Sequence, residues 1–305
     1  MPASWVALSL FYPDSVTDGN SSRPRISPVW LVLAGILSVQ FGAGIAKSLF
    51  DEISPTSIVW LRLVTSAVVL VAVARPVLRG RSRTDWLVVV AFGVCLGVMN
   101  WAIYQAFARI PLGIAVTLEF IGPLTLAVIG SRRLRDLLWV LLAGLGVAVL
   151  GLQGGGELNV AGVLFALLAG AMWASYILLA GQTGRRWPGF DGLALASVVA
   201  TVLLTPLAIG EGGGDLLDPR ILLLGAAVGV LSSVVPYSCE LVALRSIRPS
   251  VFSILMSLEP AAAALAGMVV LGEFLTWEQW LAMTLVVIAS VGATRSTRTL
   301  APAPD

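Results

Sequence analysis

The sequence predicts an all-α polytopic membrane protein whose ten transmembrane helices form two inverted five-helix repeats. Three observations lead to this fold class: the composition, a series of apolar segments of membrane-spanning length, and the alternation of arginine between successive loops. Hydrophobic residues make up 58% of the 305 residues and charged residues only 12%. Because a soluble domain carries about 25% charged residues, this composition excludes a soluble protein.

Apolar segments separated by Gly, Pro or charged residues provide the ten predicted spans, each close to the ~20 residues that cross a bilayer. Their ranges are 29–49, 56–74, 85–105, 111–130, 135–152, 159–180, 191–210, 220–241, 249–271 and 276–294. The resulting division is a flexible tail at 1–28, a first repeat at 29–152, a second repeat at 159–294 and a C-terminal tail at 295–305. Within the first tail, the apolar stretch 5–12 is too short to span and has no basic region before it, which excludes a signal peptide. The tail is interpreted as flexible or as an over-extended start.

The placement of arginine orients the predicted spans, because cytoplasmic loops are enriched in Lys and Arg. With a cytoplasmic N-terminus, the inside segments hold fifteen arginines, at positions 23, 25, 75, 79, 81, 83, 132, 133, 135, 185, 186, 245, 248, 295 and 298. The outside segments hold only Arg109 and Arg220, and acidic residues such as Asp51 and Glu273 gather there. This alternation predicts that both termini are cytoplasmic.

A weak internal repeat supports the organisation in two halves. When Pro123 is superposed on Pro260, Ala106 falls on Ala243. Each copy then forms the fourth and fifth spans of a five-span half. Because five is odd, the halves enter the membrane in opposite directions, which is the plan of many secondary transporters with a substrate site at the repeat interface.

Five ionisable residues lie within or at the edge of predicted spans: Lys47, Arg62, Glu119, Glu240 and Glu259. Such groups are costly in hydrocarbon and usually mark a substrate or ion pathway. A zwitterionic amino acid needs a cation for its carboxylate, from Lys47 or Arg62, and an anion for its ammonium, from Glu119 or Glu259. The alternative is a structural ion pair among the same groups, with Lys47 directed to the membrane surface. A pair between Glu119 and Arg62 or Lys47 is the expected contact.

Three prolines within the predicted spans indicate helix breaks. Pro123, Pro236 and Pro260 each remove the helical hydrogen bond to the carbonyl four residues earlier. The freed carbonyl at Glu119, for example, is available to an ammonium group or a water molecule. The alternative is that neighbouring helices satisfy these carbonyls.

Other polar residues are candidates for lining a cavity. Asn100 and Tyr104 share one face of the third predicted span, and Tyr237 lies in the eighth. The serines of the ninth span follow the same spacing, but helix packing through small residues is the favoured interpretation there. Trp173, inside the sixth span, is likewise interpreted as a packing residue rather than a cavity residue.

The sequence predicts neither a catalytic centre, nor a metal site, nor a cofactor, and nucleic acid is not an expected partner. The chain contains no His, so no imidazole can bind a metal or carry a proton. Its Gly triplets at 154–156 and 212–214 lie in short outside turns rather than between a strand and a helix, as a phosphate-binding loop requires. Cys95 and Cys239 lie in apolar segments and are interpreted as reduced thiols. Without a nucleotide site, the driving energy must come from an ion gradient or from the gradient of the substrate.

Five segments carry a resemblance to a known family: Phe41–Phe50, Trp60–Leu63, Pro111–Phe120, Gly122–Leu124 and Met256–Pro260. They resemble the RhtA-type threonine/homoserine exporters of the EamA branch of the drug/metabolite transporter superfamily. The resemblance runs from about Trp30 to Gly292. It implies ten helices in two inverted halves, a bacterial inner-membrane location, and efflux of small metabolites, amino acids in particular.

The predicted function is a multi-pass inner-membrane transporter that exports small amino acids by alternating access. Protons are the predicted coupling ion, entering through Glu119 or Glu259, because a buried carboxylate can exchange a proton for the substrate ammonium. The alternative cargo is another small metabolite or a cationic drug, which Lys47 and Arg62 would repel if they faced the cavity. A membrane enzyme is not favoured, because no catalytic or nucleotide motif is visible.

Overall fold

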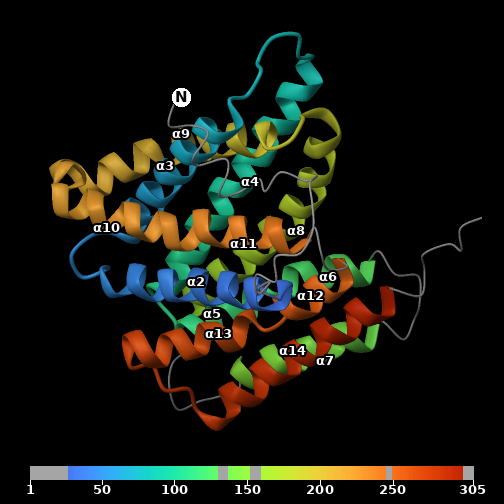
Figure 1. Ribbon diagram of the computed structural model, residues 1–305. Coiled ribbons are helices and arrows are strands. Elements are labelled where there is room, and N and C mark those ends of the chain that lie inside the picture. The colour runs from blue at the N-terminus through green and yellow to red at the C-terminus, as the bar shows by residue number, and fades with distance from the viewer. Residues whose placement is uncertain (1–26, 130–136, 152–158, 245–248, 298–305) are drawn as a thin grey trace, which may run out of the picture.

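The computed structural model describes residues 27–129, 137–151, 159–244 and 249–297, and every regular element in these ranges is a helix (Figure 1). The first group is α2 (Pro28–Ser48), α3 (Pro55–Ala74), α4 (Arg83–Phe107), α5 (Leu112–Glu119), α6 (Ile121–Ile129) and α7 (Leu137–Gly151). The second is α8 (Val160–Arg186), α9 (Asp191–Gly212), η2 (Gly213–Leu217), α10 (Pro219–Gly229), η3 (Val230–Val234), α11 (Val235–Leu244), α12 (Pro249–Met256), α13 (Glu259–Ala266), η4 (Gly267–Leu271) and α14 (Trp277–Thr297). These helices occupy the apolar segments that the sequence predicts to be membrane spans.

Six segments in the described part of the chain are long and apolar enough to cross a membrane. They are α2, α3, α4, α8, α9 and Ile254–Leu271, which runs from the end of α12 through α13 and η4. Shorter apolar helical stretches cover Leu112–Leu126, Pro219–Val234 and Trp277–Ala293. Large apolar side chains also cover the outer surface, where Val202 is 65% exposed and Leu223 is 72% exposed. An apolar exterior of this kind is suited to lipid contact.

Side-chain caps explain where α3, α4 and α8 begin. Ser82 and Asp85 form a capping box at the start of α4, in which each side chain accepts a hydrogen bond from the backbone of the other. The Ser54 side chain caps α3 just before Pro55, and Asn159 caps α8 by accepting from the backbone N–H of Gly162. Each cap lies just before an apolar segment, so the loop chemistry and the hydropathy agree on the helix starts.

Two of the predicted spans are interrupted within the residues that the structure describes. The fourth is divided at Phe120, three residues before Pro123, where α5 ends and α6 begins. The ninth is divided between Met256 and Glu259, so that Pro260 occupies the first turn of α13, where its missing N–H costs least. The eighth stays helical through Pro236, a candidate for a helix break, but contains a π-helical turn, η3, that ends two residues earlier at Val234. Turns of this type often occur inside helices at functional sites.

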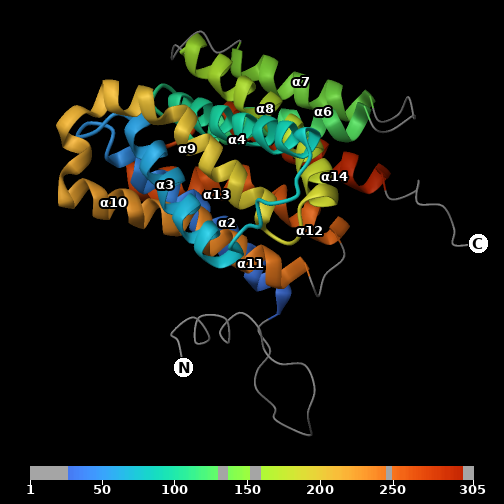
Figure 2. The same ribbon diagram turned by 90° about the horizontal axis from the view of Figure 1, so that it is seen from above.

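The helices pack in pairs from distant parts of the chain. α4 lies against α8 and α9, α5 against α13, and α7 against α14, while α2 lies between α11 and α13 (Figure 1). Small residues permit the close approaches: a Cβ at Gly42 of α2 would meet Ser232 of η3. The same arrangement seen from above has α10 at one end of the molecule and α6 and α12 at the other (Figure 2). The packing thus places α13 against both α2 and α5, so that the interrupted helices α5/α6 and α12/α13 meet.

Candidate transport site

A cavity of about 580 Å³ lies among the interrupted helices and their neighbours. Residues before position 130 and residues after position 172 both contribute to its wall. The lining residues are Val39, Gln40, Ala43, Arg62, Met99, Asn100, Ile103, Phe107, Val116, Glu119, Phe120, Pro123, Leu124, Leu126, Trp173, Tyr176, Ile177, Ser232, Pro236, Phe252, Met256, Glu259, Ser290 and Ala293. The wall is thus mainly apolar and aromatic with a few charged groups, as is typical of small-molecule sites.

Arg62 of α3 is held in the cavity wall by the other half of the chain. Its Nη2 donates to the carbonyl of Ser232 at 3.0 Å, and its Nε donates to the Ser233 hydroxyl at 3.3 Å. The Ser232 carbonyl is free to accept because the residue four positions later is Pro236, which has no N–H. The guanidinium also lies 5.8 Å from the centre of the Tyr104 ring. These contacts orient the guanidinium while its charge stays in the cavity wall.

Glu119 is the last residue of α5 and is half-buried in the same cavity wall. Pro123 frees its carbonyl, but that carbonyl points at α8, since a Cβ added to Gly170 would lie only 2.5 Å from it. The neighbouring helix therefore covers the freed carbonyl, whereas the carboxylate faces the cavity.

The expected pair between Glu119 and a cation is not formed. Among the described residues, no ion pair joins Glu119 to Arg62. Arg62 is engaged by the two serines instead, because the π-helical turn presents a carbonyl and a hydroxyl directly to its guanidinium. The cavity therefore contains a cation and an anion that are not paired directly with each other.

Glu259 is the second carboxylate of the cavity and the first residue of α13. Only 9% of its surface is exposed, and its position at a helix N-terminus favours its negative charge. It therefore lies on a broken helix, as Glu119 does, but at the start of the second segment rather than at the end of the first.

Lys47, one of the two candidate partners for a substrate carboxylate, does not line the cavity. Its Nζ lies 2.5 Å from Oε1 of Glu273 and donates to the carbonyl of Ile110 at 2.8 Å. The Lys47 side chain is only 17% exposed. Lys47 pairs with Glu273 rather than with Glu119 because the end of α2 packs beside the start of α5 and the end of η4.

Comparison with known proteins agrees with this architecture. Residues 160–295 match the EamA-like transporter family. Over 281 residues the chain is 40% identical to the threonine/homoserine exporter RhtA of Salmonella typhimurium and, equally, to that of Escherichia coli K12. Each alignment covers 90% of this chain and 95% of the exporter. The chain belongs to the EamA-like transporter family.

A protein of known crystal structure has the same fold. It is 20% identical to this transporter and superposes with a TM-score of 0.60 over 89% of this chain and 99% of its own. With the apolar helices above, the family membership identifies the chain as a multi-pass membrane protein.

The remaining candidate residues of this transporter take different positions. The Asn100 side chain lines the cavity and donates to the Leu96 carbonyl at 2.8 Å. Tyr104 is fully buried behind the wall against Phe50, and its hydroxyl has no hydrogen-bond partner in the described structure. The side chain of Tyr237, like that of Glu240, lies outside the residues whose side chains are described.

Sequence reasoning missed part of the aromatic wall. Trp173, expected to pack, both lines the cavity and meets the Phe120 ring edge-on with the ring centres 4.9 Å apart. Tyr176, three residues later on α8, lines the cavity as well. The spacing of these two residues on one face of an apolar helix is the signal that points to the same surface.

Proposed function

We propose that this protein is a secondary transporter that exports small amino acids of the threonine/homoserine type across the bacterial inner membrane. The observation that carries the proposal is the presence of Arg62 and Glu119 in one cavity without a direct ion pair. A zwitterion satisfies both charges at once, its carboxylate at Arg62 and its ammonium at Glu119. The exporters that are 40% identical to the chain carry the name of this substrate class, which supports the assignment.

In this proposal Glu259 joins Glu119 in binding the substrate ammonium. Its carboxylate and that of Glu119 lie on different broken helices that line one cavity. An ammonium group makes three hydrogen bonds, so it can use both carboxylates. An organic cation would gain the same carboxylates but would face the fixed charge of Arg62, which disfavours a cationic drug as cargo.

We propose that the fold comprises ten spans in two inverted repeats. The first half contains α2, α3, α4, α5/α6 and α7, and the second contains α8, α9, α10–α11, α12/α13 and α14. In this division α4 corresponds to α10–α11, and α2 corresponds to α8. The contact of α4 with α8 should therefore have a counterpart in a contact of α11 with α2, and both contacts are observed. Exchanging the halves also maps the pairs α3–α9 and α7–α14 onto themselves, and it maps the contact between the fourth and ninth spans, made by α5 and α13, onto a contact between the same two spans. This is the pattern expected of a two-fold axis in the membrane plane.

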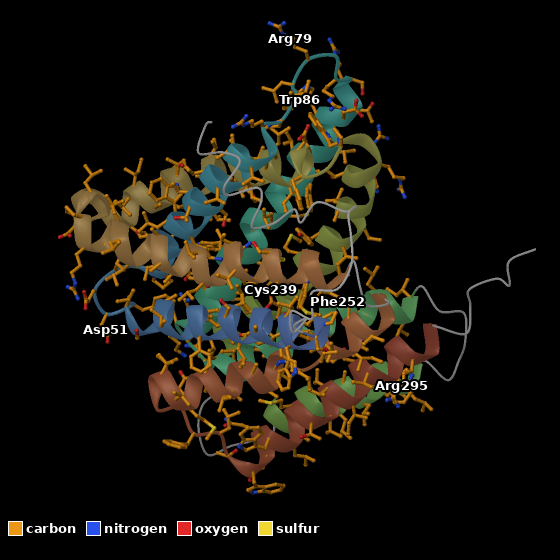
Figure 3. All side chains as sticks on the ribbon, viewed as in Figure 1. Asp51, Arg79, Trp86, Cys239, Phe252 and Arg295 are labelled. Atoms are coloured by element: carbon orange, nitrogen blue, oxygen red, sulfur yellow. The ribbon has the colours of Figure 1, made fainter. Side chains whose placement is uncertain are left out.

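The proposed orientation places both termini in the cytoplasm. In Figure 3, Asp51 lies at one end of the molecule, away from Arg79 and Arg295. In membrane proteins arginines collect on the cytoplasmic side. The separation of the acidic loop at Asp51 from Arg79 and Arg295 agrees with this rule. We call the Asp51 end the outer end below.

Proton coupling through Glu119 or Glu259 is part of the proposal. The chain has no His, so the carboxylates are the cavity groups that can exchange a proton for a substrate ammonium. Alternating access of the cavity to the two sides completes the cycle.

The test is transport by the purified protein in liposomes loaded with labelled threonine or homoserine. The expected result is saturable efflux that unlabelled substrate competes and that Arg62→Ala reduces by about tenfold or more, since a hydrogen bond to a charged group contributes ~1.5–3 kcal/mol. Glu52→Gln is the matched control, because Glu52 lies in an exposed ion pair with Arg220 outside the cavity. Efflux of a quaternary ammonium compound without efflux of either amino acid would assign the cavity to an organic cation instead.

A further inference from the structure

Lys47 and Glu273 form a polar cluster with two backbone groups at the start of α5. Glu273 accepts the backbone N–H of Leu112 on Oε2 at 2.8 Å, while its Oε1 pairs with Lys47 at 2.5 Å. Lys47 in turn donates to the carbonyl of Ile110 at 2.8 Å. The cluster therefore binds the C-terminal end of α2, the beginning of α5 and the segment after η4 to one another.

The local backbone is shaped to hold the Glu273 carboxylate. Gly272 adopts a φ of 67°, which ends η4, and the N–H of Glu273 returns to the carbonyl of Gly267 at 3.0 Å. A Cβ at Gly267 would lie 3.0 Å from Oε2 of Glu273, so the missing side chain leaves room for the carboxylate. The residue before α5 is Pro111, whose side chain provides no cap, and the Glu273 carboxylate takes over that role from another part of the chain.

The cluster lies beyond the outer end of the cavity. None of its four residues lines the cavity, whereas α2 lines it at Ala43, one turn before Lys47, and α5 lines it at Val116, one turn after Leu112. Phe252, a lining residue, lies toward Arg295 and away from Asp51 in Figure 3. The cavity therefore extends from the cluster toward the inner end.

We infer that Lys47 and Glu273 form a latch that holds the outer end of the transport cavity closed and that outward opening requires its release. The latch joins α2 and α5 of the proposed first half to the end of η4 in the second. Relative movement of the halves at this end must separate these groups. Its two side chains are only 17% and 20% exposed, so the pair is screened less than the Arg220–Glu52 pair at 68% and 46%.

Both residues act through α5, so they are positioning residues for Glu119 at the other end of that helix. The inference rests on the proposed alternating access but not on the identity of the substrate. A labelling assay therefore tests it without any transport measurement.

The test is the labelling of a cavity cysteine from each side of the membrane by an impermeant maleimide. Val39→Cys, a lining residue, is introduced into a background with Cys95→Ala and Cys239→Ala, which removes both native thiols. Right-side-out and inside-out vesicles are compared. We expect labelling of this parent mainly from the inner side.

Lys47→Ala and Glu273→Ala are expected to raise outer labelling about tenfold, the shift that loss of ~1.4 kcal/mol of closed-state preference produces, and to lower inner labelling. Lys47→Arg should stay near the parent, and so should the matched control Glu52→Gln. A misfolded variant would not show opposite changes on the two sides. Unchanged outer labelling in both alanine variants, with normal abundance in the membrane, would overturn the latch.

The exchanged variant Lys47→Glu with Glu273→Lys tests whether the latch needs its hydrogen bonds to the backbone or only the ion pair between the two side chains. In this variant an anion would face the Ile110 carbonyl and a cation the Leu112 N–H, so closure should not return. Restored closure would reject the role of the two backbone groups. If labelling follows the expected pattern while amino-acid efflux is absent, the latch stands and the proposed substrate is wrong.

Discussion

Gly122 of α6 lies directly against the backbone of Gly170 of α8. A Cβ on Gly122 would overlap the Gly170 carbonyl, and a Cβ on Gly170 would lie 2.5 Å from the carbonyl of Glu119. The two helices therefore meet backbone to backbone beside the broken segment. Small residues at such crossings permit close packing of membrane helices, and here they set the position of Glu119 relative to α8.

The first prediction concerns this crossing. Gly122→Ala should lower the thermal stability of the detergent-solubilised protein and greatly reduce transport, because overpacking costs ~1–3 kcal/mol and moves α6 away from α8. The control is Gly181→Ala on α8, where an added Cβ meets no heavy atom within 4 Å. Thermal unfolding and efflux are the measurements. Equal behaviour of the two variants would show that the crossing tolerates a methyl group.

The second prediction separates the charge of Arg62 from its geometry. Arg62→Lys keeps a cation but cannot donate at once to the Ser232 carbonyl and the Ser233 hydroxyl in the planar arrangement that the guanidinium provides. We expect a rise in KM for amino-acid efflux of about tenfold, as loss of ~1.4 kcal/mol would produce. Arg220→Lys, at an exposed outer ion pair, should leave the KM unchanged. An unchanged KM in Arg62→Lys would mean that charge alone suffices.

The third prediction concerns energy coupling. Glu119→Gln and Glu259→Gln each remove a proton-binding group from the cavity while retaining the shape of the side chain. The variant that loses the coupling group should still exchange labelled for unlabelled substrate, but an imposed proton gradient should no longer accelerate its efflux. Exchange and gradient-driven efflux are measured on the same liposomes. Acceleration that persists in both variants would reject proton coupling through these carboxylates.

The fourth prediction tests a buried hydrogen-bond junction between α3 and α4. The hydroxyl of Thr56, which is fully buried, accepts from Trp101 Nε1 at 3.2 Å and from Gln105 Nε2 at 3.1 Å. Thr56→Val leaves these donors without that acceptor, which should cost ~1–3 kcal/mol of stability. Thr284→Val is the control, because Thr284 is exposed and donates only within its own helix. Thermal unfolding that is equally affected in both variants would contradict the role of the junction.

Sequence reasoning succeeded where the signal was local. The apolar segments became helices, and the chain is interrupted at Phe120 and around Ser257, close to prolines that remove a hydrogen bond. The freed carbonyl of Ser232 is also a local consequence of Pro236, although its acceptance of Arg62 is not. The ten-span, inverted-repeat plan stays a proposal that the paired helix contacts support.

The sequence by itself determined an all-helical membrane protein, the approximate positions of the breaks in the fourth and ninth spans, and the ionisable residues from which a site can be built. Hydropathy, proline chemistry and residue type suffice for these, because they act within a few residues of one another. Only the tertiary structure decided that Lys47 binds Glu273 rather than Glu119, and that Arg62 is held by Ser232. The Arg62 contact joins residues 170 positions apart. Such contacts depend on how closely distant helices approach each other. Small residues such as Gly122 and Gly170 control that approach, and the local sequence pattern does not show which helices they bring together.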